Sequence, residues 1–204
     1  MRIITISREF GSGGRELGKR LADELGFDYY DKEIIAAVAQ GKGLDAEYVE
    51  KALDHHAWRS VPLAFGRSFG LPAMQAMETE LLIAQKQVLE GIAKLGKDCV
   101  IVGRNADLVL EEQNPFNIFV CADTQAKVQR CLERAKDGEQ LSEKEILQHM
   151  RRIDKGRAAT RAILSESEWG KAETYHLTVN TTNWNLKALA PAVAAFALKW
   201  FEQR

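Results

Sequence analysis

A glycine-rich stretch near the start of the chain has the residue types of an anion-binding loop. It comprises Gly11, Ser12, Gly13 and Gly14, followed by Arg15 and Glu16. Glycine can adopt positive φ and lets the main chain approach a ligand without an intervening Cβ. Successive N–H groups of such a loop, with the positive end of a helix dipole behind them, can bind phosphate. The stretch therefore predicts a phosphate-binding loop, although a glycine-rich turn without a ligand would have the same composition.

The elements expected on either side of the loop suit this chemistry. The run Ile3-Ile4-Thr5-Ile6 is β-branched throughout and favours a buried strand. In residues 16–25, Leu17, Leu21 and Leu25 recur every four residues, which is typical of one face of a helix. The glycines thus fall where a strand turns into a helix.

The loop departs from the phosphate-loop pattern G-x-x-x-x-G-K-[ST] at three positions. Aligning Gly14-Arg15 with Gly-Lys places Glu9 at the first glycine and Glu16 at the Ser/Thr. A guanidinium can replace the lysine ammonium as a phosphate ligand, and it can bind in a bidentate manner. The missing hydroxyl is the usual Mg²⁺ ligand of this motif, which leaves Glu16 or Ser12 as candidates.

Several segments resemble the bacterial cytidylate kinase-like family, a divergent branch of the nucleoside monophosphate kinases. The resemblance covers nearly the whole chain and is carried by residues 4–18, 26–35 and 100–107 and by the arginine-rich stretch around Asp154. It implies an α/β fold of three layers, the P-loop kinase fold, in one domain of residues 1–204. It also implies a five-stranded parallel sheet in the order 2-3-1-4-5, with a helical lid. The implied activity is transfer of the ATP γ-phosphate, with Mg²⁺, to a nucleoside monophosphate such as CMP.

Hydrophobic periodicity independently predicts alternating strands and helices. Further strands are expected at 27–30, 99–102, 117–121 and 175–180, and further helices at 32–40, 45–53, 73–95, 124–135, 142–161 and 184–201. This alternation favours a parallel sheet with right-handed crossovers.

The acceptor site is expected at the ends of two strands and in the segment 31–72. In the resembling kinases this segment closes over the acceptor nucleotide, and a Gly-Arg-Asp strand end contacts it. Here that strand end reads Gly103-Arg104-Asn105, with Asp107 nearby. The predicted acceptor residues are Asp31, Arg67, Arg104, Asn105 and Asp107. Asp31 could instead only cap the helix at 32–40, and Arg104 could be a surface arginine that caps the next helix.

A lid is expected over residues 135–169. Arg130 and Arg134, four residues apart on one helix face, precede it, and in the resembling kinases such a pair contacts ATP. Within it, Arg152 and Arg157 match the family pattern best, with Asp154 expected to orient one of them. Together with Arg15 they are the predicted catalytic residues, because phosphoryl transfer needs positive charge around the γ-phosphate. A solvated basic helix is the alternative.

Composition limits the possible partners and location. The net charge of −1 over 204 residues argues against a broad nucleic-acid-binding face. No apolar run resembles a signal peptide or is long enough to span a bilayer. Cys99, Cys121 and Cys131 are odd in number and lack metal-ligand spacing, which is typical of reduced thiols. We therefore expect a cytoplasmic monomer or homodimer that acts on a small molecule.

Two other functions remain open at this stage. Asn105 and the irregular aromatic stretch at 54–72 fit a kinase whose acceptor is not a nucleotide. The departures at Arg15 and Glu16 fit a non-catalytic, nucleotide-binding regulatory protein, although the lid arginines argue for catalysis.

Overall fold

The computed structural model describes residues 1–31, 71–134 and 142–204. The chain divides into two compact units, one of Met1–Tyr30 with Lys97–Arg204 and the other of Asp31–Gly96. The division falls where the sequence predicts the acceptor-binding segment to begin. Most of that segment lies outside the described residues, as do the helices expected at 32–40 and 45–53 and the predicted acceptor residue Arg67.

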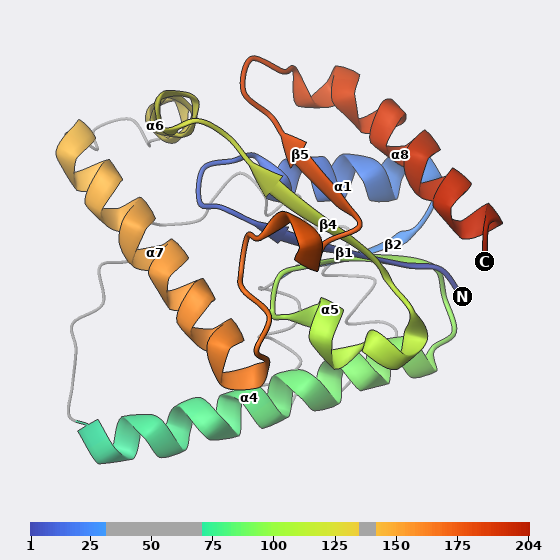
Figure 1. The fold of residues 1–204 in the computed structure, drawn as a ribbon, viewed down its shortest axis with the longest axis horizontal. Coiled ribbons are helices and arrows are strands. Elements are labelled where there is room, and N and C mark those ends of the chain that lie inside the picture. The colour runs from blue at the N-terminus through green and yellow to red at the C-terminus, as the bar shows by residue number, and fades with distance from the viewer. Residues whose placement is uncertain (32–70, 135–141) are drawn as a thin grey trace. The chain divides into compact units, whose positions relative to one another are not determined.

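A five-stranded parallel sheet forms the core of the first unit (Figure 1). Its strands are β1 (Ile3–Arg8), β2 (Asp28–Tyr30), β3 (Cys99–Val102), β4 (Phe116–Cys121) and β5 (Leu177–Asn180). They lie in the order β2-β3-β1-β4-β5, and all neighbouring pairs are parallel. The predicted α/β class and strand order are confirmed.

The central strand is β1, and its residues Ile3 to Ser7 are all buried. Ile3, Ile4 and Ile6 are at most 1% exposed, and Ile4 pairs with Val100 on one side and with Phe116 on the other. A strand covered on both faces has this continuous hydrophobic character. The chain that follows β1 therefore leaves the middle of the sheet at its carboxyl edge, where open α/β sheets bind ligands.

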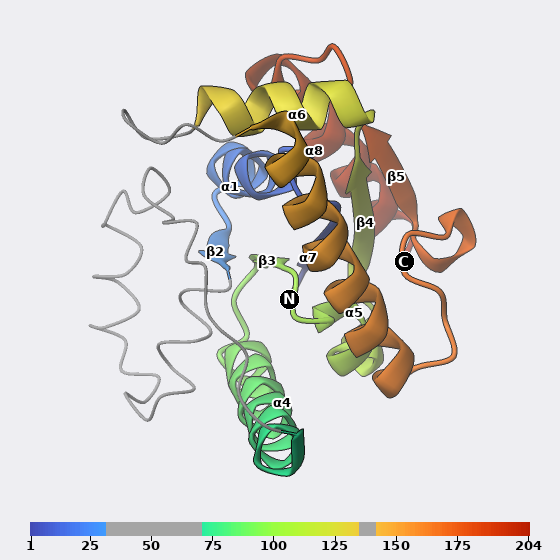
Figure 2. The ribbon, with the colours of Figure 1, turned by 90° about the vertical axis from the view of Figure 1, so that its left-hand side faces the viewer.

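Helices cover both faces of this sheet. They are α1 (Gly14–Leu25), α5 (Ala106–Val109), α6 (Thr124–Glu133), α7 (Glu143–Leu164) and α8 (Leu186–Glu202), with 3-10 turns at Glu111–Gln113 and Ala172–Thr174. α1 and α8 lie together on one face and α5 lies on the other (Figures 1 and 2). α6 and α7 lie beyond the carboxyl ends of the central strands (Figure 1). The helices that carry the predicted arginines are thus at the same edge as the glycine-rich loop.

Local signals in the sequence set several helix ends. Ser142 and Glu145 form the predicted capping box at the start of α7, and the Asp123 side chain accepts the Ala126 N–H at the start of α6. Pro191 does not end α8, which runs through it to Glu202. In the second unit, α4 (Leu71–Lys94) matches the helix predicted at 73–95.

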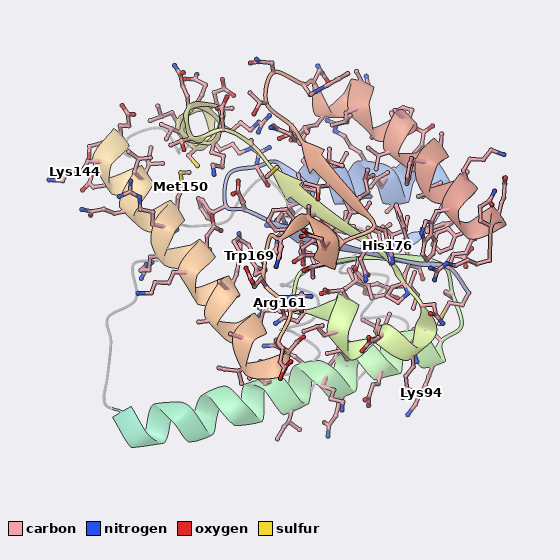
Figure 3. All side chains as sticks on the ribbon, viewed as in Figure 1. Lys94, Lys144, Met150, Arg161, Trp169 and His176 are labelled. Carbon is pink, nitrogen blue, oxygen red and sulfur yellow. The ribbon has the colours of Figure 1, made fainter. Side chains whose placement is uncertain are left out.

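The last strand begins two residues later than predicted, at Leu177. His176 precedes it, and its Nδ1 accepts the Asn117 N–H at 2.9 Å. A side chain therefore takes the acceptor role that a strand carbonyl would otherwise have. The ring of Tyr175 packs against Phe119 instead of continuing the alternation of a strand. Figure 3 shows His176 beside the sheet and α8.

Among the described residues, no helix is both long and apolar enough to cross a membrane. The same residues contain no group of three or more His, Cys, Asp or Glu side chains that could hold a metal ion.

Candidate active site

The glycine-rich loop joins β1 to α1 with two glycines in the left-handed region. Gly11 has φ 75° and Gly13, the N-cap of α1, has φ 80°. Other residues rarely adopt this conformation, so the sequence places glycine where the backbone requires it. The loop directs the N-terminus of α1, with its first-turn N–H groups, toward the carboxyl edge of the sheet. These residues fit a bound phosphate group.

Hydrogen bonds from β4, β5 and α6 hold the loop in place. The Ser12 hydroxyl donates to Glu9 O at 2.8 Å, and Ser12 O accepts from the Thr181 hydroxyl at 2.7 Å. The Glu9 carboxylate accepts from Lys127 Nζ at 2.8 Å, and the Glu9 N–H donates to Val120 O at 2.9 Å. Glu9, at the motif's first glycine position, therefore ties the loop to α6 and β4.

Helix α7 also contacts the loop directly. Asp154 accepts the Phe10 N–H at 2.8 Å and a hydrogen bond from Arg157 Nη1 at 2.8 Å, and the same nitrogen donates to Arg8 O at 2.9 Å. Burial raises the pKa of Asp154, and the positive charge of Arg157 offsets part of this rise. As expected from the sequence, Asp154 orients an arginine, and that arginine is Arg157. Arg152 is exposed on the same helix and lies 3.3 Å from His149 Nδ1.

The side chain of Phe10 anchors this contact in apolar surroundings. It packs against a cluster of Val128, Ile146 and Met150 from α6 and α7, and its ring meets His149 edge to face at 4.9 Å between centroids. Figure 3 shows Met150 on the side of α7 that faces α6. The glycine-rich loop therefore packs against both α6 and α7.

Substituting Gly14 tests how tightly the loop is packed. A Cβ at this position would lie 2.6 Å from Arg8 Cβ and 3.2 Å from Val120 Cβ, which cannot move without the backbone. We expect Gly14→Ala to destabilise the protein by about 1–3 kcal/mol, the usual range for overpacking, and to weaken ATP binding. Urea unfolding and calorimetric ATP titration measure the two effects.

Gly156→Ala is the matched control. A Cβ there meets nothing within 4 Å, so alanine in the interior of α7 should stabilise the protein by about 0.5–1 kcal/mol. Equal stability of Gly14→Ala and wild type would contradict the tight packing.

The predicted ATP-binding arginines of α6 have different partners. Arg130 donates to the Thr181 hydroxyl at 3.0 Å and to Thr181 O at 2.6 Å. Arg134, directly after α6, donates to Glu16 Oε2 at 2.6 Å. Burial lowers the pKa of Arg130, and the positive charge of Arg134 lowers it further. Arg134 therefore contacts the first turn of α1, whereas Arg130 contacts Thr181, whose hydroxyl donates to the loop at Ser12 O.

The end of β3 has a strained backbone. Gly103, Arg104 and Asn105 have φ of 84°, 62° and 50°, and non-glycine residues in this region tend to cluster at functional sites. Arg104 is half-buried, and Asn105 is the N-cap of α5. A Cβ on Gly103 would collide with the guanidinium of Arg8. The side chain of Arg8, at the end of β1, therefore packs against the backbone at the end of β3. Sequence reasoning missed Arg8, because nothing in the motif distinguishes it.

Asp107 forms a buried ion pair that the sequence did not indicate. Its Oδ2 accepts from Arg161 Nη1 at 2.6 Å, and the two side chains are 3% and 2% exposed. Its Oδ1 is buried and accepts no hydrogen bond from the residues that the structure describes. Figure 3 shows Arg161 on α7 near Trp169. Asp31, the other predicted acceptor carboxylate, directly follows β2 and is buried.

The side chains predicted to bind Mg²⁺ have protein partners in the structure. Both carboxylate oxygens of Glu16 accept hydrogen bonds from arginines. The hydroxyl of Ser12 belongs to a fully buried residue and donates to a carbonyl. The Glu16 carboxylate thus faces two guanidinium groups, and the Ser12 hydroxyl is shielded from solvent.

The fold and the loop together define a P-loop kinase. The chain belongs to the cytidylate kinase-like family, which matches residues 3–183. No curated protein matches the chain in sequence.

Solved structures support the fold. An uncharacterized protein from Eubacterium ventriosum ATCC 27560 is 25% identical, with all of both chains covered and a TM-score of 0.70. A shikimate kinase from Acinetobacter baumannii is 13% identical, with 98% of this chain and 94% of that chain covered and a TM-score of 0.52. A shikimate kinase from Bacteroides thetaiotaomicron is 14% identical, with 96% and 97% covered and a TM-score of 0.53.

Proposed function

We propose that the protein transfers the γ-phosphoryl group of ATP to a nucleoside monophosphate, with CMP as the first candidate. The observation that carries this proposal is the convergence of charged side chains on the glycine-rich loop. Arg134 is bound to the first turn of α1, and Arg157 is bound to the end of β1, both through hydrogen bonds of less than 3 Å. A protein that only bound a nucleotide would need less positive charge at the transferred phosphate.

The donor site comprises the loop and its neighbours. Backbone N–H groups of residues 11–16 and the side chain of Arg15 would bind the phosphates of ATP, and Arg130 and Arg134 would contact the same nucleotide. In the reaction, the bond between the γ-phosphorus and the bridging oxygen of ADP breaks while an acceptor oxygen bonds to phosphorus. Arg15, Arg152 and Arg157 would stabilise the charge on the transferred group. Family membership and the loop support ATP as donor, and kinases generally use it together with Mg²⁺.

The acceptor site would include Arg104, Asn105 and Asp107 at the end of β3, with Asp31 and Arg67 from the segment 31–72. A phosphate acceptor is already an anion, so no general base is required. Asn105 offers an amide in place of the acid of the resembling kinases, and an amide both donates and accepts. The preference for cytosine therefore depends on this position.

The arm at 135–169 would act as a lid. Asp154 and Arg157 of its helix α7 contact the loop, so a closed lid would hold both residues near the donor phosphates and exclude water. We also propose a cytoplasmic location.

A kinase of another small molecule is the second candidate. The A. baumannii shikimate kinase was solved with shikimate, whose acceptor group is a hydroxyl, and it shares this fold at low identity. An acceptor hydroxyl must lose a proton, so such a reaction would need a base that a nucleotide acceptor does not.

One panel tests the acceptor. Purified protein is mixed with ATP, Mg²⁺ and single acceptors, both nucleoside monophosphates and hydroxyl compounds including shikimate, and ADP release is measured. We expect a nucleoside monophosphate to stimulate release most. Stimulation by hydroxyl compounds alone would favour the second candidate, and no stimulation by any acceptor would favour a regulatory protein.

Arg104→Ala extends the panel to the site. It should raise the KM of the acceptor or lower kcat while leaving the Kd of ATP nearly unchanged. Arg204→Ala is the control, because Arg204 stacks on Trp200 at the end of the chain. If Arg104→Ala impairs ATP binding and leaves the KM of the acceptor unchanged, Arg104 belongs to the donor site, and the two sites are assigned the wrong way round.

A further inference from the structure

Glu16 occupies the position at which the phosphate-loop motif carries its metal-binding hydroxyl, yet both oxygens of its carboxylate accept hydrogen bonds from arginines. Oε1 accepts from Arg20 Nε at 3.0 Å and from Arg20 Nη2 at 2.9 Å. Oε2 accepts from Arg134 Nη2 at 2.6 Å. Arg20 is four residues further along α1, whereas Arg134 comes from the end of α6, 118 residues away.

This arrangement is unsuited to a cation. A carboxylate that binds Mg²⁺ must turn an oxygen toward the ion, and here both oxygens face guanidinium groups. Two further positive charges close to the same carboxylate would repel a metal ion. The side chain of Glu16 is only 23% exposed, so its oxygens cannot swing freely to another ligand.

We infer that Glu16 is a positioning residue, which holds Arg134 beside the donor phosphates in place of a metal-binding hydroxyl. This inference rests on the proposed function, since it assigns Arg134 to the phosphates of ATP. Glu16 is the third residue of α1, and an acidic side chain in a first helical turn is stabilised by the helix dipole. The Glu16 carboxylate is therefore held in one place and can orient an arginine.

Arg134 needs a partner that restricts its side-chain conformation. Its side chain is 51% exposed, and an arginine on a surface otherwise samples many rotamers. It also lies near Arg130, whose positive charge opposes it, and the carboxylate of Glu16 offsets that repulsion. Arg134 donates to Glu16 through Nη2. Its Nε and Nη1 are further donors, and these could donate to a phosphate oxygen.

Calorimetric titration with ATP tests the inference, once with Mg²⁺ and once with EDTA. The proteins are wild type, Glu16→Gln, Arg134→Gln and the double variant. Each single variant should weaken ATP binding about tenfold, the loss of one charged hydrogen bond. The double variant should lose about as much as either single one, because the two residues act through one contact. The losses should be the same with and without Mg²⁺.

Controls separate this effect from a loss of structure. Asp23→Asn removes an exposed ion pair with Lys19 on the same helix and should leave ATP affinity unchanged. Thermal unfolding verifies that each variant is folded, and Arg134→Lys, which keeps the charge, should recover part of the affinity. If Glu16→Gln does not fold, Glu16→Asp replaces it, since the shorter carboxylate cannot reach Arg134 in the same geometry.

Four outcomes would overturn the inference. A loss in Glu16→Gln that occurs only with Mg²⁺ would make Glu16 a metal ligand. Losses that add up in the double variant would mean that the two residues act separately. Unchanged affinity in Glu16→Gln, with normal binding by wild type, would remove the positioning role alone, whereas a wild-type protein that does not bind ATP would remove the proposed function as well.

Discussion

Arg15→Ala should weaken ATP binding or abolish turnover. Arg15 is the second residue of α1 and directly follows the glycines of the loop, at the motif position of the phosphate-binding lysine. A charged hydrogen bond lost from a desolvated site costs roughly 2–4 kcal/mol, which corresponds to a loss of roughly 30-fold to several hundredfold. Calorimetry with ATP and a turnover assay measure it.

A matched variant shows whether charge or shape matters at this position. Arg15→Lys restores the residue of the general motif, so it should keep much of the ATP affinity that Arg15→Ala loses. Thermal unfolding shows whether both variants are folded. Unchanged ATP affinity together with unchanged turnover in Arg15→Ala would refute the donor site.

Asp107→Ala should cause the largest loss of stability. It would leave the guanidinium of Arg161, one of the most buried side chains of the chain, without its carboxylate. Removing one partner of a buried ion pair typically costs about 3–5 kcal/mol. Among the described residues, Arg161 would retain Ser167, which accepts from Nε at 3.0 Å, and the ring of Tyr175 at 5.4 Å. Urea unfolding at equilibrium gives the free energy directly.

The double variant Asp107→Leu/Arg161→Met distinguishes a structural pair from an acceptor ligand. Two apolar side chains leave no unpaired charge, so much of the lost stability should return. If Asp107 also binds the acceptor, the stable double variant should still show a raised KM for it. A loss below about 1 kcal/mol in Asp107→Ala would contradict the importance of the pair.

The fold was largely predictable because local and global patterns agree. The β-branched run Ile3 to Ile6 and the apolar run of β3 both favour buried strands. The glycines fall between a strand and a helix. Ser142 and Glu145 mark the start of α7. The strand order came from the family resemblance, since periodicity alone does not order strands. Strand ends were less predictable where a side chain such as that of His176 takes over a backbone hydrogen bond.

The partners of the charged residues were not predictable, because they join distant parts of the chain. Glu16 and Arg134 are 118 residues apart, and Phe10 and Asp154 are 144 apart. Glu16 was one of two candidate Mg²⁺ ligands in the sequence, and in the structure its oxygens accept hydrogen bonds from Arg20 and Arg134.

One signal within α7 could have revealed more. Ile146 and Met150 begin an inward-facing stripe, and continuing it by steps of four, three and four residues leads to Asp154, Arg157 and Arg161. All three have inward partners in the structure, whereas Arg152 lies off the stripe and is exposed. Charged residues that continue an apolar stripe are thus candidates for buried pairs.

Phosphorus-31 magnetic resonance of the protein with ATP, Mg²⁺ and CMP tests the central claim, phosphoryl transfer, most directly. We expect the γ-phosphate signal of ATP to fall while β-phosphate signals of ADP and CDP rise in equal amounts. Phosphoryl transfer to another nucleoside monophosphate, and not to CMP, would change the proposed acceptor but would still support phosphoryl transfer. An ATP spectrum that stays unchanged with every nucleoside monophosphate and every hydroxyl acceptor would contradict it.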